Sequence, residues 1–425
     1  MRRTVLTIAA IFILVVLVRF ASVMTYRDGN FDPRGQMTSW SRIAFNLVSG
    51  EGYVYGSGAP TARRGPVPVL FLASLFYLFG PQAFPVPIVV SQWVWDAASA
   101  VLIYFITMDL WGRQQVAVLA AVMFALHPIV TENSIQVNVE PLATFLLLAF
   151  ILTFLRALYN PKWVRFIWPG SLLGLSILSL AVLQFFPVLA VALIVVALRA
   201  EKRRTLVAVA TFCLSLLVVW SPWIIRNYLV LDTFVPVSTL GGHNLLKNHQ
   251  TLGEADYLRF RNTQEDEVIK ERLFAARGID IKQLSEVEQD ELFRAAALDF
   301  IRTYPDRFLT LSVVRFFRLW FNQGLGLGPN MLAYVATAVN GPLILLTLTA
   351  CLCFRGDWIK LALPLLALLV YSTAFYVATA AELRYSIPFM PLIIILSAYA
   401  LVNIAVRLSS NRKRGLLAFW HRETG

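Results

Sequence analysis

Directly after its first apolar run, the chain reads Asp28-Gly-Asn-Phe-Asp32-Pro, then Ile43-Ala-Phe-Asn-Leu-Val-Ser-Gly-Glu-Gly-Tyr53, then Pro60-Thr-Ala-Arg-Arg-Gly-Pro-Val-Pro68. The segment brings carboxylates, an amphipathic stretch, paired arginines and prolines close to a membrane span. A loop that only joins two spans does not need these side chains, whereas a loop that handles a charged lipid headgroup does. The segment therefore predicts a functional loop at a membrane surface.

The composition is typical of a helical membrane protein. Of the 425 residues, 58% are hydrophobic and 15% are charged, and the mean hydropathy is +0.66. These values exclude a soluble globular domain and a disordered chain. Because lipid requires backbone polar groups to be paired within the chain, we predict an all-α polytopic membrane protein with about 10–12 transmembrane helices.

The apolar runs place the expected spans. We expect them near residues 4–24, 85–111, 114–132, 139–158, 166–182, 184–198, 205–224, 331–354, 358–378 and 385–407. The first is expected to be an uncleaved span rather than a signal peptide, because its apolar stretch is long for a signal peptide and many spans follow it.

The basic residues predict the orientation. They lie in short runs between or after the spans, such as Arg2-Arg3, Lys202-Arg203-Arg204 and Arg412-Lys413-Arg414. The cytoplasmic bias of Lys and Arg explains the net charge of +12 better than nucleic-acid binding does. We therefore predict a multi-pass protein of the cell membrane with both termini in the cytoplasm. The predicted outer segments are residues 25–84, 133–138, 225–330 and 379–384.

Two apolar segments are short for a span, namely residues 66–80 and 308–322. Counting either alone as a span inverts part of the charge pattern, so we interpret both as interfacial or re-entrant helices on the outer side. The alternative is that both are tilted spans and that one charged loop breaks the rule.

Three parts are predicted along the chain. Residues 1–224 form an N-terminal transmembrane catalytic module that includes the outer loop 25–84. Residues 225–330 form a small outer, juxtamembrane helical cap. Residues 331–425 form the last transmembrane helices and a basic cytoplasmic tail.

Charged residues near the membrane are the candidates for function, since such groups are costly there. At one face the expected topology gathers Asp28, Asp32, Arg63, Arg64, Glu140, Arg226 and Arg384. Asp96 lies inside a span, nearer that face than the centre, and an arginine of the outer loop is its expected partner. Arginines hold phosphate in a bidentate manner, and a carboxylate can take a proton from an acceptor as general base. The set suits a lipid-linked sugar phosphate.

Each residue also has a plainer interpretation. Glu140 begins a helix, where an acid favours the helix dipole, and Arg226 and Arg384 can act as interface anchors. Asp32 precedes a proline and suits an Asx turn, while Asp28 can be a solvated charge beside Arg27.

Four pieces of the chain resemble the polyprenyl-phosphate-sugar-dependent membrane glycosyltransferases, the superfamily of the protein O-mannosyltransferases and lipid A aminoarabinose transferases. They are the segments 43–53 with 60–68, Glu140-Pro-Leu, Ser221-Pro-Trp-Ile-Ile-Arg-Asn227 with 234–242, and Arg384-Tyr-Ser-Ile-Pro388. The resemblance implies the C-type glycosyltransferase fold with a first outer catalytic loop. It also implies hexosyl or pentosyl transfer, with inversion, from a polyprenyl-phosphate donor to a glycan, lipid or protein acceptor at the outer face.

The resemblance further implies an aspartate in the first outer loop as general base and basic residues around the lipid phosphate. This chain has Gln36 where that aspartate is expected. The nearest carboxylates are Asp32 and Asp28, so Asp32 is the predicted base, with Asp28 second. The predicted substrate-binding residues are Arg63, Arg64, Asp96, Glu140, Arg226 and Arg384.

Two further classes of function stay open at this point. One is a lipid or sugar transporter or flippase, and the other is a non-catalytic homologue that has lost the base. No metal ligands are predicted and no cofactor is certain. A divalent cation is left open, because some relatives use one and others do not.

Overall fold

The computed structural model describes residues 2–26, 37–56, 58–259, 263–323, 330–353 and 358–423. Helices dominate this part of the chain, in which Val54 and Pro60 form an isolated β-bridge. The prediction of an all-α polytopic membrane protein is therefore confirmed.

Eight of the described helical segments are long and apolar enough to cross a membrane, or nine if the bent pair α5–α6 counts as one span. The helices that contain the eight are α1 (Arg2–Tyr26), α4 (Val86–Trp111), α7 (Glu140–Tyr159), α9 (Phe186–Leu198), α10 (Lys202–Leu231), α15 (Met331–Cys353), α16 (Trp358–Thr379) and α18 (Met390–Glu423). The 3-10 turn Ala181–Phe185 extends the α9 span, and α17 (Leu383–Ser386) with the turn Ile387–Phe389 extends the α18 span.

The remaining helices are not single candidate spans. They are α2 (Ser39–Val48), α3 (Pro66–Phe79), α5 (Gln114–Ala125), α6 (Pro128–Ser134), α8 (Ile167–Ser179), α11 (Gly241–Lys247), α12 (Thr263–Ala275), α13 (Glu286–Thr303) and α14 (Pro305–Phe321). The described chain thus has fewer spans than the ten segments that we expected, partly because the segment 166–182 holds only the 13-residue helix α8. Neither α3 nor α14, the two short apolar segments, is among the candidate spans.

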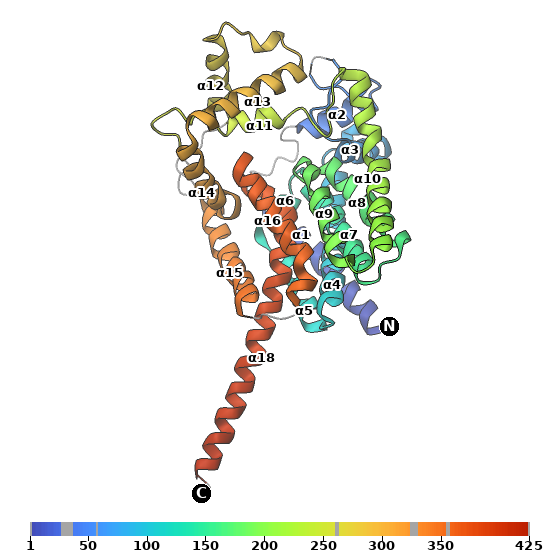
Figure 1. Ribbon diagram of the computed structural model, residues 1–425, viewed down its shortest axis with the longest axis vertical. Coiled ribbons are helices and arrows are strands. Elements are labelled where there is room, and N and C mark those ends of the chain that lie inside the picture. Colours follow the sequence, from blue (N-terminus) through green and yellow to red (C-terminus); the bar gives the residue numbers. More distant parts are fainter. Residues whose placement is uncertain are drawn as a thin grey trace.

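Helices α11, α12 and α13 form a cap at one end of the helical bundle (Figure 1). A small core joins α11, α12 and α13 through Leu246, Phe274 and Phe293. The start of α13 is fixed by a capping box, in which Ser285 and Glu288 bond each other's backbone N–H groups. We call the bundle end that carries these helices the cap face. Figure 1 shows the N-terminal end of α1 and the C-terminal end of α18 at the opposite end.

Two glycines let α8 pack closely along α10. A Cβ atom on Gly170 would lie 2.4 Å from the carbonyl oxygen of Phe212, and one on Gly174 would lie 2.9 Å from the Cβ of Val219. Small residues four apart allow this approach between membrane helices, where dispersion and not water exclusion drives association. Within the resulting α7–α8–α10 layer, the start of α7 and the end of α8 line the cavity described below.

A buried ion pair joins the first span to the second. The Nε of Arg19 in α1 lies 2.8 Å from Oδ2 of Asp96 in α4, and both side chains are at most 1% exposed. Arg19 also donates to the carbonyl oxygen of Ala125 and to Thr131, and Ser134 donates to Asp96. The predicted partner of Asp96, an outer-loop arginine, is therefore wrong: Arg19 lies within the apolar run of α1 and reaches the carboxylate from inside the bundle.

Candidate functional site

A cavity of about 220 Å³ lies at the cap face. Its walls come from segments far apart in the sequence: α2, the loop before α3, the start of α7, the end of α8, the segment that leads into α11, the end of α16, and α17. The polar and aromatic lining residues are Trp40, Arg63, Arg64, Glu140, Ser179, Gln184, Ser238, Asn244, Phe375, Tyr376, Thr379, Arg384 and Tyr385. Four of the predicted site residues therefore meet at one cavity: Arg63, Arg64, Glu140 and Arg384.

Arg64 is held by the short helix before it. Its Nε donates to the hydroxyl of Ser39 at 2.7 Å, and its guanidinium carbon lies 3.9 Å from the ring centroid of Trp40. Burial, followed by the neighbouring charge of Arg63, lowers the pKa of Arg64 to about 10. The side chain therefore still carries its charge at neutral pH, in a partly desolvated place where an anion binds more strongly.

The loop that bears Arg63 and Arg64 lies against the end of α8. A Cβ atom on Gly65 would lie 2.2 Å from the carbonyl oxygen of Leu178, so only glycine fits this contact without a shift. The hydroxyl of Tyr53 donates to the carbonyl oxygen of Arg64 at 2.8 Å. These two contacts fix the position of Arg63 and Arg64 at the cavity.

Arg384 lies in α17 and lines the same cavity. Its Nε lies 2.9 Å from Oε2 of Glu382, and its guanidinium carbon lies 5.3 Å from the ring centroid of Tyr385. Tyr385 stacks on Tyr376, with ring centroids 5.1 Å apart. The aromatic pair gives this wall a flat, apolar surface beside a cationic group.

Glu140 is the one acidic residue of the described lining. It begins α7, as predicted, and is 7% exposed. Its Oε2 accepts a hydrogen bond from the backbone N–H of Val139 at 3.1 Å. Three guanidinium groups and one carboxylate line the described part of the cavity, and Glu382 pairs with Arg384 beside it. One positive charge remains, so the cavity favours an anionic ligand.

Arg226 lies near the cavity and contacts the backbone of the loop that carries Arg63 and Arg64. Its Nη1 donates to the carbonyl oxygen of Thr61 at 2.8 Å. Its guanidinium carbon lies 5.2 Å from the ring centroid of Tyr53 and 5.1 Å from that of Trp223. Arg226 is not among the lining residues in the described chain, and this geometry favours a positioning role over direct contact with a ligand.

Asp96 is also missing from the cavity lining, as far as the structure describes it. Its carboxylate is occupied by Arg19 and Ser134 inside the bundle. The predicted substrate-binding role of Asp96 therefore finds no support in its contacts, which explain its burial by a structural ion pair.

The predicted general bases cannot be placed. Asp28 and Asp32, like Gln36, lie outside the described residues, so their assignment stays a prediction. Within the described chain, no three His, Cys, Asp or Glu side chains gather in a way that could hold a metal ion.

Several residues at this site were not predicted, among them Trp40 and Tyr376 in the lining and Glu286 behind the arginine loop. Glu286, in the first turn of α13, accepts hydrogen bonds from the hydroxyl of Thr61 and the backbone N–H of Ala62, both at 2.6 Å, and from the hydroxyl of Thr239 at 3.1 Å. The capping-box pattern at Ser285 marks the start of a helix. This pattern does not predict which groups the carboxylate of a residue in the first turn contacts.

The fold and part of the sequence match known proteins. The structure resembles the oligosaccharyltransferase AglB from Archaeoglobus fulgidus, in complex with an inhibitory peptide and a dolichol-phosphate, with a TM-score of 0.57 and 17% sequence identity over 96% of this chain and 51% of that chain. Its apo form gives a TM-score of 0.54 at 17% identity, over 96% and 52% of the two chains. This chain has the C-type glycosyltransferase fold. It spans about half the length of that archaeal enzyme.

Two further matches were found, one to a family model and one to a solved structure. Residues 63–225 match the family model described as dolichyl-phosphate-mannose-protein mannosyltransferase, which confirms the resemblance that the sequence indicated. ArnT from Cupriavidus metallidurans bound to undecaprenyl phosphate gives a TM-score of 0.42 at 12% identity, over 94% of this chain and 77% of that one. No match was found among curated proteins.

Proposed function

We propose that this protein is an integral-membrane glycosyltransferase that moves a sugar from a polyprenyl-phosphate donor to an acceptor at the cap face, the outer side of the membrane. The observation that carries the proposal is the gathering of Arg63, Arg64 and Arg384 around one cavity at the end of the bundle. The family match and the glycosyltransferase fold support it, as does the dolichol-phosphate held by the archaeal neighbour.

In this proposal the arginines hold the lipid phosphate. Guanidinium groups pair with phosphate oxygens through parallel hydrogen bonds, and the flat wall of Tyr376 and Tyr385 suits the apolar part of the donor. Arg226 and Glu286 do not touch the donor in this scheme. They hold the loop that carries Arg63 and Arg64.

The reaction is a single displacement at the anomeric carbon of the sugar. A base takes the proton of the acceptor hydroxyl or amine, whose heavy atom forms a bond to that carbon while the bond to the phosphate oxygen breaks. The leaving phosphate gains negative charge, which the arginines stabilise. We assign the base to Asp32, with Asp28 second. Glu140 is the carboxylate that the described lining offers, although it already accepts a backbone hydrogen bond.

Sugar transfer by the purified protein tests this function. The protein is reconstituted with a polyprenyl-phosphate hexose or pentose and a mixed acceptor pool, and release of polyprenyl phosphate is measured. We expect release with the wild type and strongly reduced release with Arg64→Gln/Arg384→Gln. Arg42→Gln removes a charge from α2 at the same face without touching the lining and is expected to keep activity.

Asp32→Asn tests the base separately. Loss of transfer with retained donor binding supports the assignment. Unchanged transfer in both Asp32→Asn and Asp28→Asn moves the base elsewhere. No transfer by the wild type from either donor class, despite donor binding, points instead to a non-catalytic homologue.

A further inference from the structure

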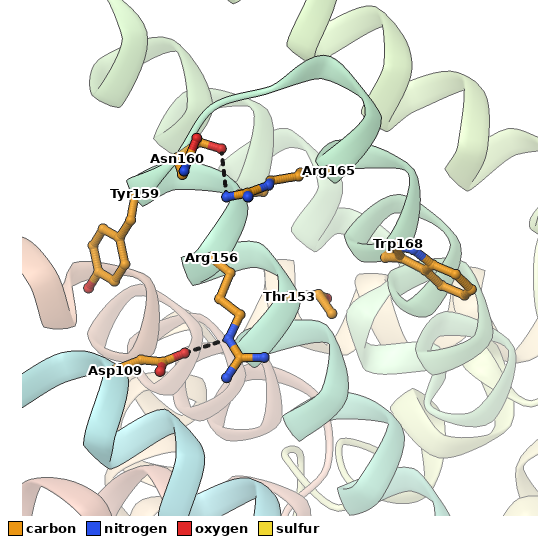
Figure 2. Close-up of a pocket in the computed structure, with 8 residues that line it drawn as sticks. Asp109, Thr153, Arg156, Tyr159, Asn160, Arg165 and Trp168 are labelled. Carbon is orange, nitrogen blue, oxygen red and sulfur yellow. Dashed lines mark hydrogen bonds and ion pairs between the residues drawn. The ribbon is translucent and has the colours of Figure 1, made fainter. Parts of the chain in front are cut away.

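A second cavity lies at the opposite end of the bundle. Its volume is about 490 Å³, and it is lined by Asp109, Thr153, Arg156, Ala157, Tyr159, Asn160, Arg165 and Trp168 (Figure 2). These residues come from the end of α4, the end of α7, the connecting 3-10 turn Trp163–Phe166 and the start of α8. No step of the proposed transfer uses any of them.

Helix geometry places this cavity at the other membrane surface. Glu140 at the start of α7 lines the cavity at the cap face, whereas Arg156 near its end lines the second one. Sixteen residues of α-helix separate the two side chains, which is about 24 Å at 1.5 Å per residue. Helix α8 shows the same division, with Trp168 at one cavity and Ser179 at the other.

The second cavity is cationic. The Nε of Arg156 lies 2.6 Å from Oδ2 of Asp109, and this pair uses one edge of the guanidinium. Arg165 donates from Nη1 to the carbonyl oxygen of Asn160 at a long 3.4 Å. Figure 2 shows Arg156 pointing toward Asp109 and Arg165 pointing toward Asn160. In the described lining, two guanidinium groups therefore face one carboxylate, and a positive charge is left over.

Aromatic side chains set the depth of the cavity in the membrane. The exposed fractions of Trp168, Trp163 and Tyr159 are 67%, 58% and 42%. Exposed indole and phenol rings at the end of a membrane helix lie at the level of the lipid headgroups. The cavity thus opens at the depth of the headgroup phosphates, with both arginines and exposed aromatic rings in its lining.

We propose that this cavity binds the phosphate of an anionic phospholipid from the leaflet opposite the cap face. The two arginines supply the charge-assisted hydrogen bonds that a phosphodiester accepts. The surplus positive charge favours a headgroup of net negative charge over a zwitterionic one, whose ammonium group is repelled. Trp168, which follows Arg165 into α8, covers the first carbons of the lipid. Basic pockets between membrane helices bind anionic headgroups in this way.

Lipid binding to the delipidated, detergent-solubilised full chain tests the proposal. Short-chain phosphatidylglycerol, short-chain phosphatidylcholine and inorganic phosphate are titrated in parallel, and bound ligand is counted by native mass spectrometry. The wild type is expected to bind phosphatidylglycerol about tenfold more tightly than phosphatidylcholine. Inorganic phosphate is expected to bind weakly, because it lacks the apolar part that Trp168 covers.

Charge variants decide whether this cavity is responsible. Arg156→Gln/Arg165→Gln is expected to lose the preference for phosphatidylglycerol. Arg199→Gln/Arg203→Gln removes two charges from the junction between α9 and α10 and is expected to keep it. Asp109→Asn frees Arg156 and removes the one negative charge, so it is expected to tighten phosphatidylglycerol binding, which a merely structural role for the ion pair does not explain.

Three results overturn the proposal. The first is an equal preference in the wild type and in Arg156→Gln/Arg165→Gln. The second is weaker phosphatidylglycerol binding in a folded Asp109→Asn variant. The third is inorganic phosphate that binds as tightly as the lipid, which makes the ligand a free phosphate. If Arg156→Gln/Arg165→Gln fails to fold, Arg165→Gln alone keeps the Arg156–Asp109 pair and answers the same question.

Discussion

The carboxylate of Glu286 accepts a hydrogen bond of 2.6 Å from the backbone N–H of Ala62, although 224 residues separate the two in the sequence. The contact joins the cap to the loop whose next two residues are Arg63 and Arg64. The cap therefore holds the cationic wall of the cavity from outside. Sugar transfer should depend on this contact even though Glu286 is assigned no part in the chemistry.

Glu286→Gln is expected to lower transfer at least about tenfold. The amide keeps the size of the side chain but loses the charge, and hydrogen bonds to a charged group contribute about 1.5–3 kcal/mol each. The loss should appear mainly in donor KM, because the displaced arginines bind the donor phosphate. Glu291→Gln makes the same change farther along α13 and serves as the control. Equal kinetics in the two variants would show that the cap does not position the loop.

Gly65→Ala is expected to reduce transfer by about a hundredfold, since a displacement of about 1 Å can have that effect on catalysis. The added Cβ would lie 2.2 Å from the carbonyl oxygen of Leu178, so the arginine loop must move away from α8. Gly341→Ala is the control, because its nearest neighbour, a ring carbon of Phe321, lies at 4.0 Å. Initial transfer rates of the two variants are compared after gel filtration has shown that both are folded. Equal rates would contradict the prediction.

Removing either Arg19 or Asp96 alone from this buried ion pair should strongly destabilise the protein. Removing one partner of a buried ion pair leaves an uncompensated charge and costs about 3–5 kcal/mol. Arg19→Leu/Asp96→Leu removes both charges, and its thermal unfolding temperature in detergent should lie above those of Arg19→Leu and Asp96→Leu. A double variant that is less stable than both single ones contradicts this view of the pair.

The stability of the protein should fall in acid through His249. Its Nδ1 lies 2.7 Å from the carbonyl oxygen of Leu245 and its Nε2 lies 2.9 Å from Nη1 of Arg315, so the neutral ring donates at one nitrogen and accepts at the other. Burial, followed by the charge of Arg315, lowers the pKa of His249 to about 3. A second proton on the ring would face the arginine.

The sign of this effect follows from proton uptake. Between pH 6.5 and about 3 the unfolded chain binds a proton at His249 that the folded chain does not. The stability from the neutral ring is therefore complete above pH 6.5 and decreases as pH falls toward 3. Unfolding temperatures measured between pH 7 and pH 4 should fall more for the wild type than for His249→Gln. Parallel curves for the two proteins would exclude His249 as the source.

Much of the cavity could be predicted from the sequence, because charges at helix ends follow from the apolar runs and their basic flanks. Arg63, Arg64, Glu140 and Arg384 meet as that pattern indicates. The partner of Asp96 could not be predicted, since an arginine 77 residues away inside another apolar run leaves no local pattern.

Tertiary contacts explain the other differences. Hydropathy alone does not show that α8 ends at Ser179, where the chain turns before α9, and so the number of spans was not fixed by the apolar runs. The role of Glu286 depends on a contact between the cap and the first loop, which no sequence pattern encodes.

We place the lipid phosphate of the donor at the cap face among Arg63, Arg64 and Arg384. A structure of the full chain with bound polyprenyl phosphate tests this placement. We expect phosphate density within hydrogen-bond distance of the guanidinium groups of Arg64 and Arg384, beside the stacked rings of Tyr376 and Tyr385. Polyprenyl phosphate bound only at the opposite end of the bundle, with this cavity empty, would exclude the placement.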